Sequence, residues 1–123
     1  MSTTPNQPDP DEPVINWTAA LEATGDDHSL LGELVTLFLD ESSTLLSDIR
    51  RAIEQEDAEL LRRSSHTLKG SLRIFDSRRA IDYAAQMEQL GKSEQLAQAP
   101  ALLEELEPRL KLVIEELKRH HPA

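Results

Sequence analysis

The stretch SSHTLKGSLRIF combines residue types that can do chemistry with the hydrophobic spacing of a helix. His66, Lys69 and Gly70 lie three to four positions apart, so on an α-helix they share one face. Arg62 precedes His66 by about one turn and Arg73 follows it by about two, which adds two cations to that face. The leucines of the stretch fall on the other side. The spacing therefore predicts a solvent-facing histidine among basic side chains.

This arrangement suits a nucleophile that accepts a phosphoryl group. The attacking imidazole must be uncharged, and neighbouring cations disfavour its protonation while they stabilise the charge of the incoming phosphoryl group. Lys69 is best placed for that stabilising role. Gly70 costs a helix about 0.5–1 kcal/mol relative to alanine, and the gain would be room for another protein's active site to approach His66. The alternatives are an ordinary surface histidine, a solvated basic helix face and a glycine required by close helix packing.

The hydrophobic pattern along the chain predicts helices and no strands. From Asp27 onward the period is near 3.6 residues, and the polar run DESST leaves open whether this segment forms two helices or a bent one. Capping and stop signals set the other expected helices: Asn16 to Gly25, Asp57 to Phe75, Ser77 to Gly91, and a last helix that starts between Ser93 and Pro100. Short connections favour antiparallel neighbours. We therefore expect an all-α fold, an antiparallel up-down four-helix bundle with a short additional N-terminal helix.

The turn near residues 76–77 sets the register of the two helices that flank it. At a rise of about 1.5 Å per residue, His66 should lie level with Gln86 to Glu88 on an antiparallel neighbour. Glu88 is expected to reach His66 and accept the Nδ1 hydrogen, which would leave Nε2 as the nucleophile and fix the ring. Gln86 is the alternative partner for this orienting role.

Length and composition limit the class of protein. The 123 residues favour one domain, and residues 1–13, with four of the seven prolines, predict a disordered tail or linker before a helical bundle over residues 14–120. The chain has no cysteine, no apolar run long enough for a membrane helix and no apolar core of a signal peptide. We expect a cytoplasmic protein without membrane insertion.

The charge is strongly negative overall but uneven along the chain. A net charge of −10 argues against nucleic acid as the main partner, because phosphate repels an acidic surface. Between Arg62 and Arg79, however, six residues are basic and one is acidic. Such a local basic surface favours an anionic partner or group. No metal site is predicted, and His120 and His121 are interpreted as the end of the last helix.

The hexapeptide HTLKGS, read as His-x-x-Lys-Gly-Ser, resembles the histidine-containing phosphotransfer (HPt) domain of two-component phosphorelays. The upstream LLGELVTLFLDE is similar to the first bundle helix of that family, and MEQLGK is similar to the end of its fourth helix. The resemblance covers roughly residues 15–118. Asp76 and Ala84 depart from it, because family members often have a small residue or glycine at the first position and a small residue or cysteine at the second.

The resemblance implies roles for individual residues. His66 matches the phosphorylated histidine, Lys69 the lysine that assists the phosphoryl group, and Gly70 the glycine that admits the receiver domain. Glu88 falls where the family often has a polar residue that hydrogen-bonds the histidine. Arg62 and Arg73, on the same face, are expected to contribute with Gly70 to docking of the partner.

The function expected on this basis is that of a phosphorelay intermediate. It would accept a phosphoryl group on His66 from the phosphoaspartate of one receiver domain and pass it to another, with the receivers of a hybrid sensor kinase and a response regulator as partners. It would be a monomeric, stoichiometric carrier and not an enzyme, without a cofactor of its own, since Mg²⁺ belongs to the receiver. Two alternatives are a non-phosphorylated helical adaptor that binds a receiver or kinase, and a purely structural or dimerising bundle.

Overall fold

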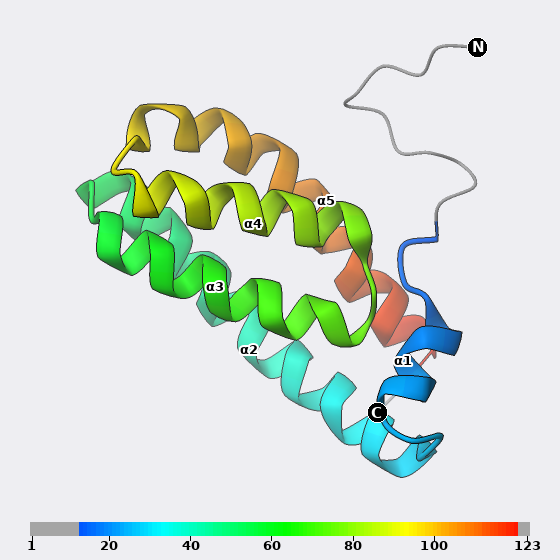
Figure 1. Cartoon of the computed structure of the whole chain (residues 1–123). Helices are drawn as coiled ribbons and strands as arrows, with labels where there is room; N and C mark the ends of the chain where they lie inside the picture. The colour runs from blue at the N-terminus through cyan, green and yellow to red at the C-terminus, as the bar shows by residue number, and fades with distance from the viewer. Residues whose placement is uncertain (1–12, 121–123) are drawn as a thin grey trace, which may run out of the picture.

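The computed structural model describes residues 13–120, except for the side chain of His120, and shows an all-helical bundle (Figure 1). Its four long helices are α2 (His28–Gln55), α3 (Ala58–Ile74), α4 (Arg78–Lys92) and α5 (Ala99–His120). The short α1 (Trp17–Ala23) contacts α2 and α3 at one end, and a 3-10 turn, η1 (Leu96–Gln98), precedes α5. The predicted fold class is confirmed. The predicted tail, residues 1–13, lies outside the described residues except for Pro13.

Polar caps begin three of the helices, two of them at the predicted caps Asn16 and Asp57 and the third at Asp27, which was not predicted as a cap. Asn16, Asp27 and Asp57 each accept a hydrogen bond at 3.0 Å from the backbone N–H three residues ahead, which satisfies one of the unpaired donors of the first turn. Ser77 holds the N-cap position of α4, but its side chain makes no capping hydrogen bond. α4 therefore starts at the predicted place without the predicted contact.

One other helix boundary resolves an open question, and a second differs from expectation. α2 continues through DESST as one helix, and Ser42 of that run is buried in the bundle. Gly91 does not stop α4, because the helix continues to Lys92 with Ser93 as its C-cap. Pro108 lies inside α5 on the exposed side, where the hydrogen bond it cannot donate is tolerated.

The long helices enclose one hydrophobic core. Phe38 of α2 and Phe75, which ends α3, meet edge to face at a centroid distance of 5.5 Å. The largest fully buried hydrophobic side chains are Val35, Ile49, Leu61, Leu68, Leu72, Phe75, Met87, Leu106, Leu110, Val113 and Leu117. Every long helix contributes to this set, so each of them turns an apolar face towards the core.

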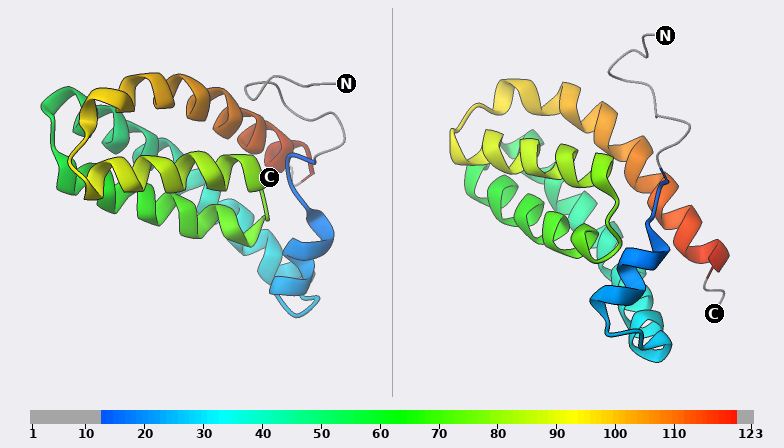
Figure 2. Two further views of the ribbon diagram at one scale, coloured as in Figure 1. Left: turned by 45° about the horizontal axis from the view of Figure 1, so that its top comes forward. Right: turned by 45° about the vertical axis from the view of Figure 1, so that its right-hand side comes forward.

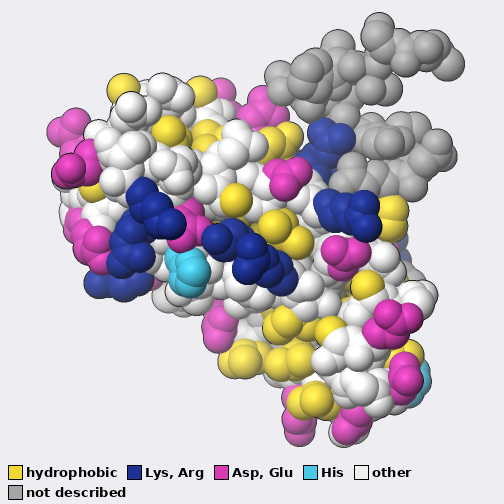
Figure 3. Space-filling view, viewed as in Figure 1, with side chains coloured by type: hydrophobic (Ala, Val, Ile, Leu, Met, Phe, Trp, Pro, Cys, Tyr) yellow, Lys and Arg dark blue, Asp and Glu magenta, His cyan; other side chains and the backbone are white. Residues whose placement is uncertain are grey.

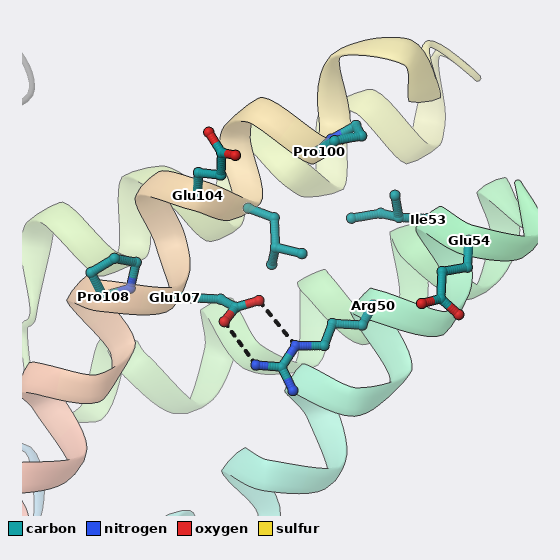
Figure 4. Close-up of a pocket in the computed structure, with 8 residues that line it drawn as sticks. Arg50, Ile53, Glu54, Pro100, Glu104, Glu107 and Pro108 are labelled. Carbon is teal, nitrogen blue, oxygen red and sulfur yellow. Dashed lines mark hydrogen bonds and ion pairs between the residues drawn. The ribbon is translucent and has the colours of Figure 1, made fainter.

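α3 and α4 form one side of the bundle, and α2 and α5 form the other (Figure 2). On the α2–α5 side, the guanidinium of Arg50 donates two hydrogen bonds to the carboxylate of Glu107, at 3.0 and 2.7 Å (Figure 4). This ion pair ties the two helices together across a groove of about 500 Å³ whose lining includes Ile53 and Leu103. No described helix combines the length and the apolar character that crossing a bilayer requires.

Candidate functional site

His66 lies on the outer face of α3 with 62% of its side chain exposed. Both neighbouring positions on the inner face, Ser65 and Leu68, are fully buried, so the helix itself directs His66 away from the core. On the side of the molecule formed by α3 and α4, Lys and Arg side chains lie on either side of a histidine (Figure 3). The predicted solvent-facing histidine in a basic neighbourhood is present.

Glu88 of α4 meets His66 across the α3–α4 interface. Its Oε2 lies 2.9 Å from Nδ1 of His66, and only 6% of the Glu88 side chain is exposed. The two residues are equally far in sequence from Ser77, where the chain turns, as the antiparallel register predicts. Gln86, the alternative partner, is exposed.

A close approach of the two helices lets the Glu88 side chain span this interface. A Cβ added to Gly91 would lie 2.6 Å from the backbone nitrogen of Arg62 and 2.9 Å from its Cα, so only glycine fits there. Ala80 and Ala84, also on α4, are fully buried. Gly91 thus lets the backbone of α4 approach that of α3 close to the site.

The surroundings of Glu88 keep its carboxyl ionised. Burial alone would raise the pKa of Glu88, but hydrogen bonds from Lys69 and His66, with the charge of Lys69, outweigh burial and hold that pKa below its usual value. An ionised carboxylate can only accept hydrogen bonds, so Nδ1 of His66 must carry the hydrogen between them. In the neutral ring, Nε2 then has the free lone pair, and 62% of the His66 side chain is exposed.

Lys69 is turned towards Glu88 and is less exposed than its place beside His66 suggests. Its Nζ lies 2.6 Å from Oε1 of Glu88, and 15% of its side chain is exposed. The carboxylate thus contacts the imidazole with one oxygen and the ammonium group with the other. One connected site is thus formed by His66, Lys69 and Glu88 where the α3–α4 interface meets the surface of the molecule.

The other predicted site residues surround this cluster without joining it. Gly70 is exposed, and a Cβ built on it would have no heavy atom within 4 Å, so the packing of the described residues does not explain this glycine. Arg62 is bound to Glu59 on its own helix, at 2.6 Å between Nη2 and Oε1. Arg73 is exposed. The space above Gly70 and the positive charge of the face are therefore available to a partner.

Sequence reasoning missed one contact of the site and left open which leucines of α2 are exposed. Nζ of Lys92 lies 3.7 Å from Oε2 of Glu88, a contact that the four-residue spacing on α4 could have indicated. Leu30 and Leu37, one above the other on α2, are 40% and 51% exposed. The sequence groups them with the core stripe of α2, and only the packing of the neighbouring helices separates exposed leucines from buried ones.

Comparison with known proteins bears on the family and the fold. The family model described as the Hpt domain matches residues 33–120, which is more than half of the chain. The structure is similar to the crystal structure of histidine-containing phosphotransfer protein B from Pseudomonas aeruginosa, with a TM-score of 0.81 and 22% identity over 89% of this chain and 95% of that one. At this identity the likeness concerns the fold. The search of curated proteins finds no significant match.

Proposed function

The chain belongs to the Hpt domain family, and on that premise we propose that it is a phosphorelay intermediate that carries a phosphoryl group on His66. The donor is the phosphoaspartate of one receiver domain, and the acceptor is an aspartate of a second. Family membership supports the phosphotransfer role in a two-component system. The contact between Nδ1 of His66 and the ionised Glu88 is the observation that carries the choice of atom, because it leaves Nε2 free on a side chain that is 62% exposed.

In the transfer step, the lone pair of Nε2 attacks phosphorus while the bond from phosphorus to the aspartate oxygen breaks. The aspartate leaves as a carboxylate, and the phosphorylated ring keeps its Nδ1 hydrogen. Glu88 stabilises the positive charge that grows on the ring. Lys69 supplies charge to the phosphoryl oxygens. The reverse step returns the group to a receiver, so the chain is a stoichiometric carrier with no turnover of its own. Mg²⁺ acts on the receiver side of the complex, and this chain contributes no cofactor.

In this proposal the receiver docks over His66 on α3 and over exposed leucines of α2, the helix that packs against α3. Leu30 and Leu37 offer apolar contact on α2, Gly70 leaves space at the histidine, and Arg62 and Arg73 attract an acidic active site. Such an interface is modest and transient, because the partner must leave after transfer. The physiological partners in this proposal are the receivers of a hybrid sensor kinase and a response regulator, met in the cytoplasm by a monomer.

The test is to incubate the chain with phosphorylated receiver domains and to follow acid-labile, alkali-stable phosphate on it. We expect a label on the wild type, none on His66→Gln, and slower labelling of Lys69→Ala with its helical circular dichroism intact. A non-phosphorylated adaptor would bind receivers equally well with His66→Gln and would never acquire the label. That outcome would replace the relay proposal with the adaptor.

A further inference from the structure

Glu88 lies near two lysines as well as His66, so it is the centre of a charge cluster. Its Oε1 binds Nζ of Lys69 at 2.6 Å, and its Oε2 lies 2.9 Å from Nδ1 of His66 and 3.7 Å from Nζ of Lys92. The two lysines differ in their surroundings, since 15% of the Lys69 side chain is exposed but 54% of that of Lys92. One cation is held close to the carboxylate, and a second, more exposed one stands just beyond hydrogen-bond distance.

Lys69 cannot keep its short contact with Glu88 while it binds a phosphoryl group. In the proposed transfer it must turn towards the phosphoryl oxygens on Nε2, and its short contact with Oε1 then weakens. Glu88 would be left as a buried carboxylate without its closest cation, which is costly and favours uptake of a proton. A protonated Glu88 would no longer hold the Nδ1 hydrogen of His66 by its charge.

We infer that Lys92 is a positioning residue that replaces Lys69 as the cation paired with Glu88 when Lys69 turns to the phosphoryl group. Lys92 follows Glu88 by one turn of α4, so its long side chain can close the remaining distance without a movement of the backbone. Arg62 also experiences the charge of Glu88, but its guanidinium is bound to Glu59. Lys92 therefore keeps Glu88 ionised and His66 oriented while Lys69 acts on the phosphoryl group. This inference rests on the proposed function.

The experiment loads His66 with phosphoramidate, which needs no partner protein. Nε2 forms a bond to phosphorus, the phosphorus–nitrogen bond of the reagent breaks, and ammonia leaves. The loading rate is measured by mass spectrometry for the wild type, Lys92→Ala, Lys92→Arg, Glu88→Gln and the double variant of Glu88→Gln with Lys92→Ala. Lys118→Ala, which removes an exposed lysine of α5, is the charge-matched control.

We expect Lys92→Ala to load about threefold more slowly, a modest effect because the Lys92 side chain is half exposed. Lys92→Arg should restore the rate, and Lys118→Ala should match the wild type. In the Glu88→Gln background, Lys92→Ala should cause no further loss, because Lys92 acts through the carboxylate. Equal slowing in both backgrounds would mean that Lys92 merely attracts the anion, and an unchanged rate in Lys92→Ala would overturn the inference as well.

The two proposals fail in different ways. If phosphorylated receivers never label the wild type, the proposed function fails whatever Lys92 does. If receivers label His66 and Lys92→Ala behaves as the wild type in both assays, the relay stands and only the role of Lys92 is wrong.

Discussion

Glu88 and His66 share a hydrogen bond of 2.9 Å in which the carboxylate is buried and the imidazole is exposed. The bond therefore joins the interior of the bundle to its surface and distinguishes the two ring nitrogens. Nδ1 is held by the protein, and Nε2 is left for a partner. A histidine without such a contact could present either nitrogen, so this pairing is the structural basis of the proposed selectivity for Nε2.

Glu88→Gln should change how stability depends on pH. Because the folded protein holds the pKa of Glu88 below the ordinary value of 4.5, its ionised form stabilises the fold above that pH. The contribution is lost as the pH falls through the lower pKa of the folded state. We expect the difference in unfolding free energy between the wild type and Glu88→Gln to be constant above about pH 4.5. On further acidification, the wild type should lose stability relative to Glu88→Gln.

Urea denaturation followed by circular dichroism, repeated over a pH series, measures this difference. Glu107→Gln is a useful reference. The pKa of Glu107 is also lowered, by its hydrogen bonds with Arg50, and Glu107 lies on the opposite side of the bundle from Glu88. A difference between wild type and Glu88→Gln that moves in favour of the wild type in acid would contradict the assigned ionisation.

The two glycines of the site region should respond in opposite ways to alanine. Gly70→Ala adds a Cβ that meets no heavy atom within 4 Å, so helix propensity should dominate and raise stability by about 0.5–1 kcal/mol. Gly91→Ala puts a Cβ 2.6 Å from the backbone nitrogen of Arg62, and overpacking of this kind costs about 1–3 kcal/mol. Thermal or urea unfolding measures both changes.

Gly70→Ala should nevertheless accept phosphate from a receiver more slowly, because the added methyl group occupies space that the partner needs. Its loading by phosphoramidate, a small reagent, should be affected less. A stabilised Gly70→Ala that receives phosphate from receivers at the wild-type rate would show that the open space is not used for docking.

Leu37→Ser should weaken receiver binding without unfolding the protein. The Leu37 side chain is 51% exposed, so its loss should change stability by less than about 0.5 kcal/mol. Leu112→Ser is the matched control, since Leu112 is 39% exposed but lies on α5 and not on α2. Calorimetric titration with a receiver that labels the wild type should show weaker binding for Leu37→Ser alone. Equal affinities for the two variants would exclude α2 from the docking surface.

The fold and the centre of the site could be predicted because both follow from local periodicity and one turn. The helical period identified the bundle, and the antiparallel register about Ser77 identified Glu88 as the partner of His66. The direction of the Lys69 side chain could not be predicted, because its spacing from His66 permits an outward orientation as well as contact with Glu88.

Other features depend on distances between helices, which the periodicity does not fix. The sequence pattern predicts Gly91 as a helix stop, whereas in the structure it allows the backbones of α3 and α4 to approach. Leu30 and Leu31 are neighbours in one apolar pattern, yet the first is 40% exposed and the second 8%, because the surrounding helices cover only one of them. Ser42, in a polar run that suggested a break, is buried within continuous α2.

The most direct measurement of the central claim is nuclear magnetic resonance of ¹⁵N-histidine-labelled protein after loading by a phosphorylated receiver. We predict a phosphorus–nitrogen coupling at Nε2 of His66 and a proton retained on Nδ1. Phosphate on Nδ1, phosphate on another residue, or a protein that remains unmodified in the presence of receivers that label other members of the family would contradict it.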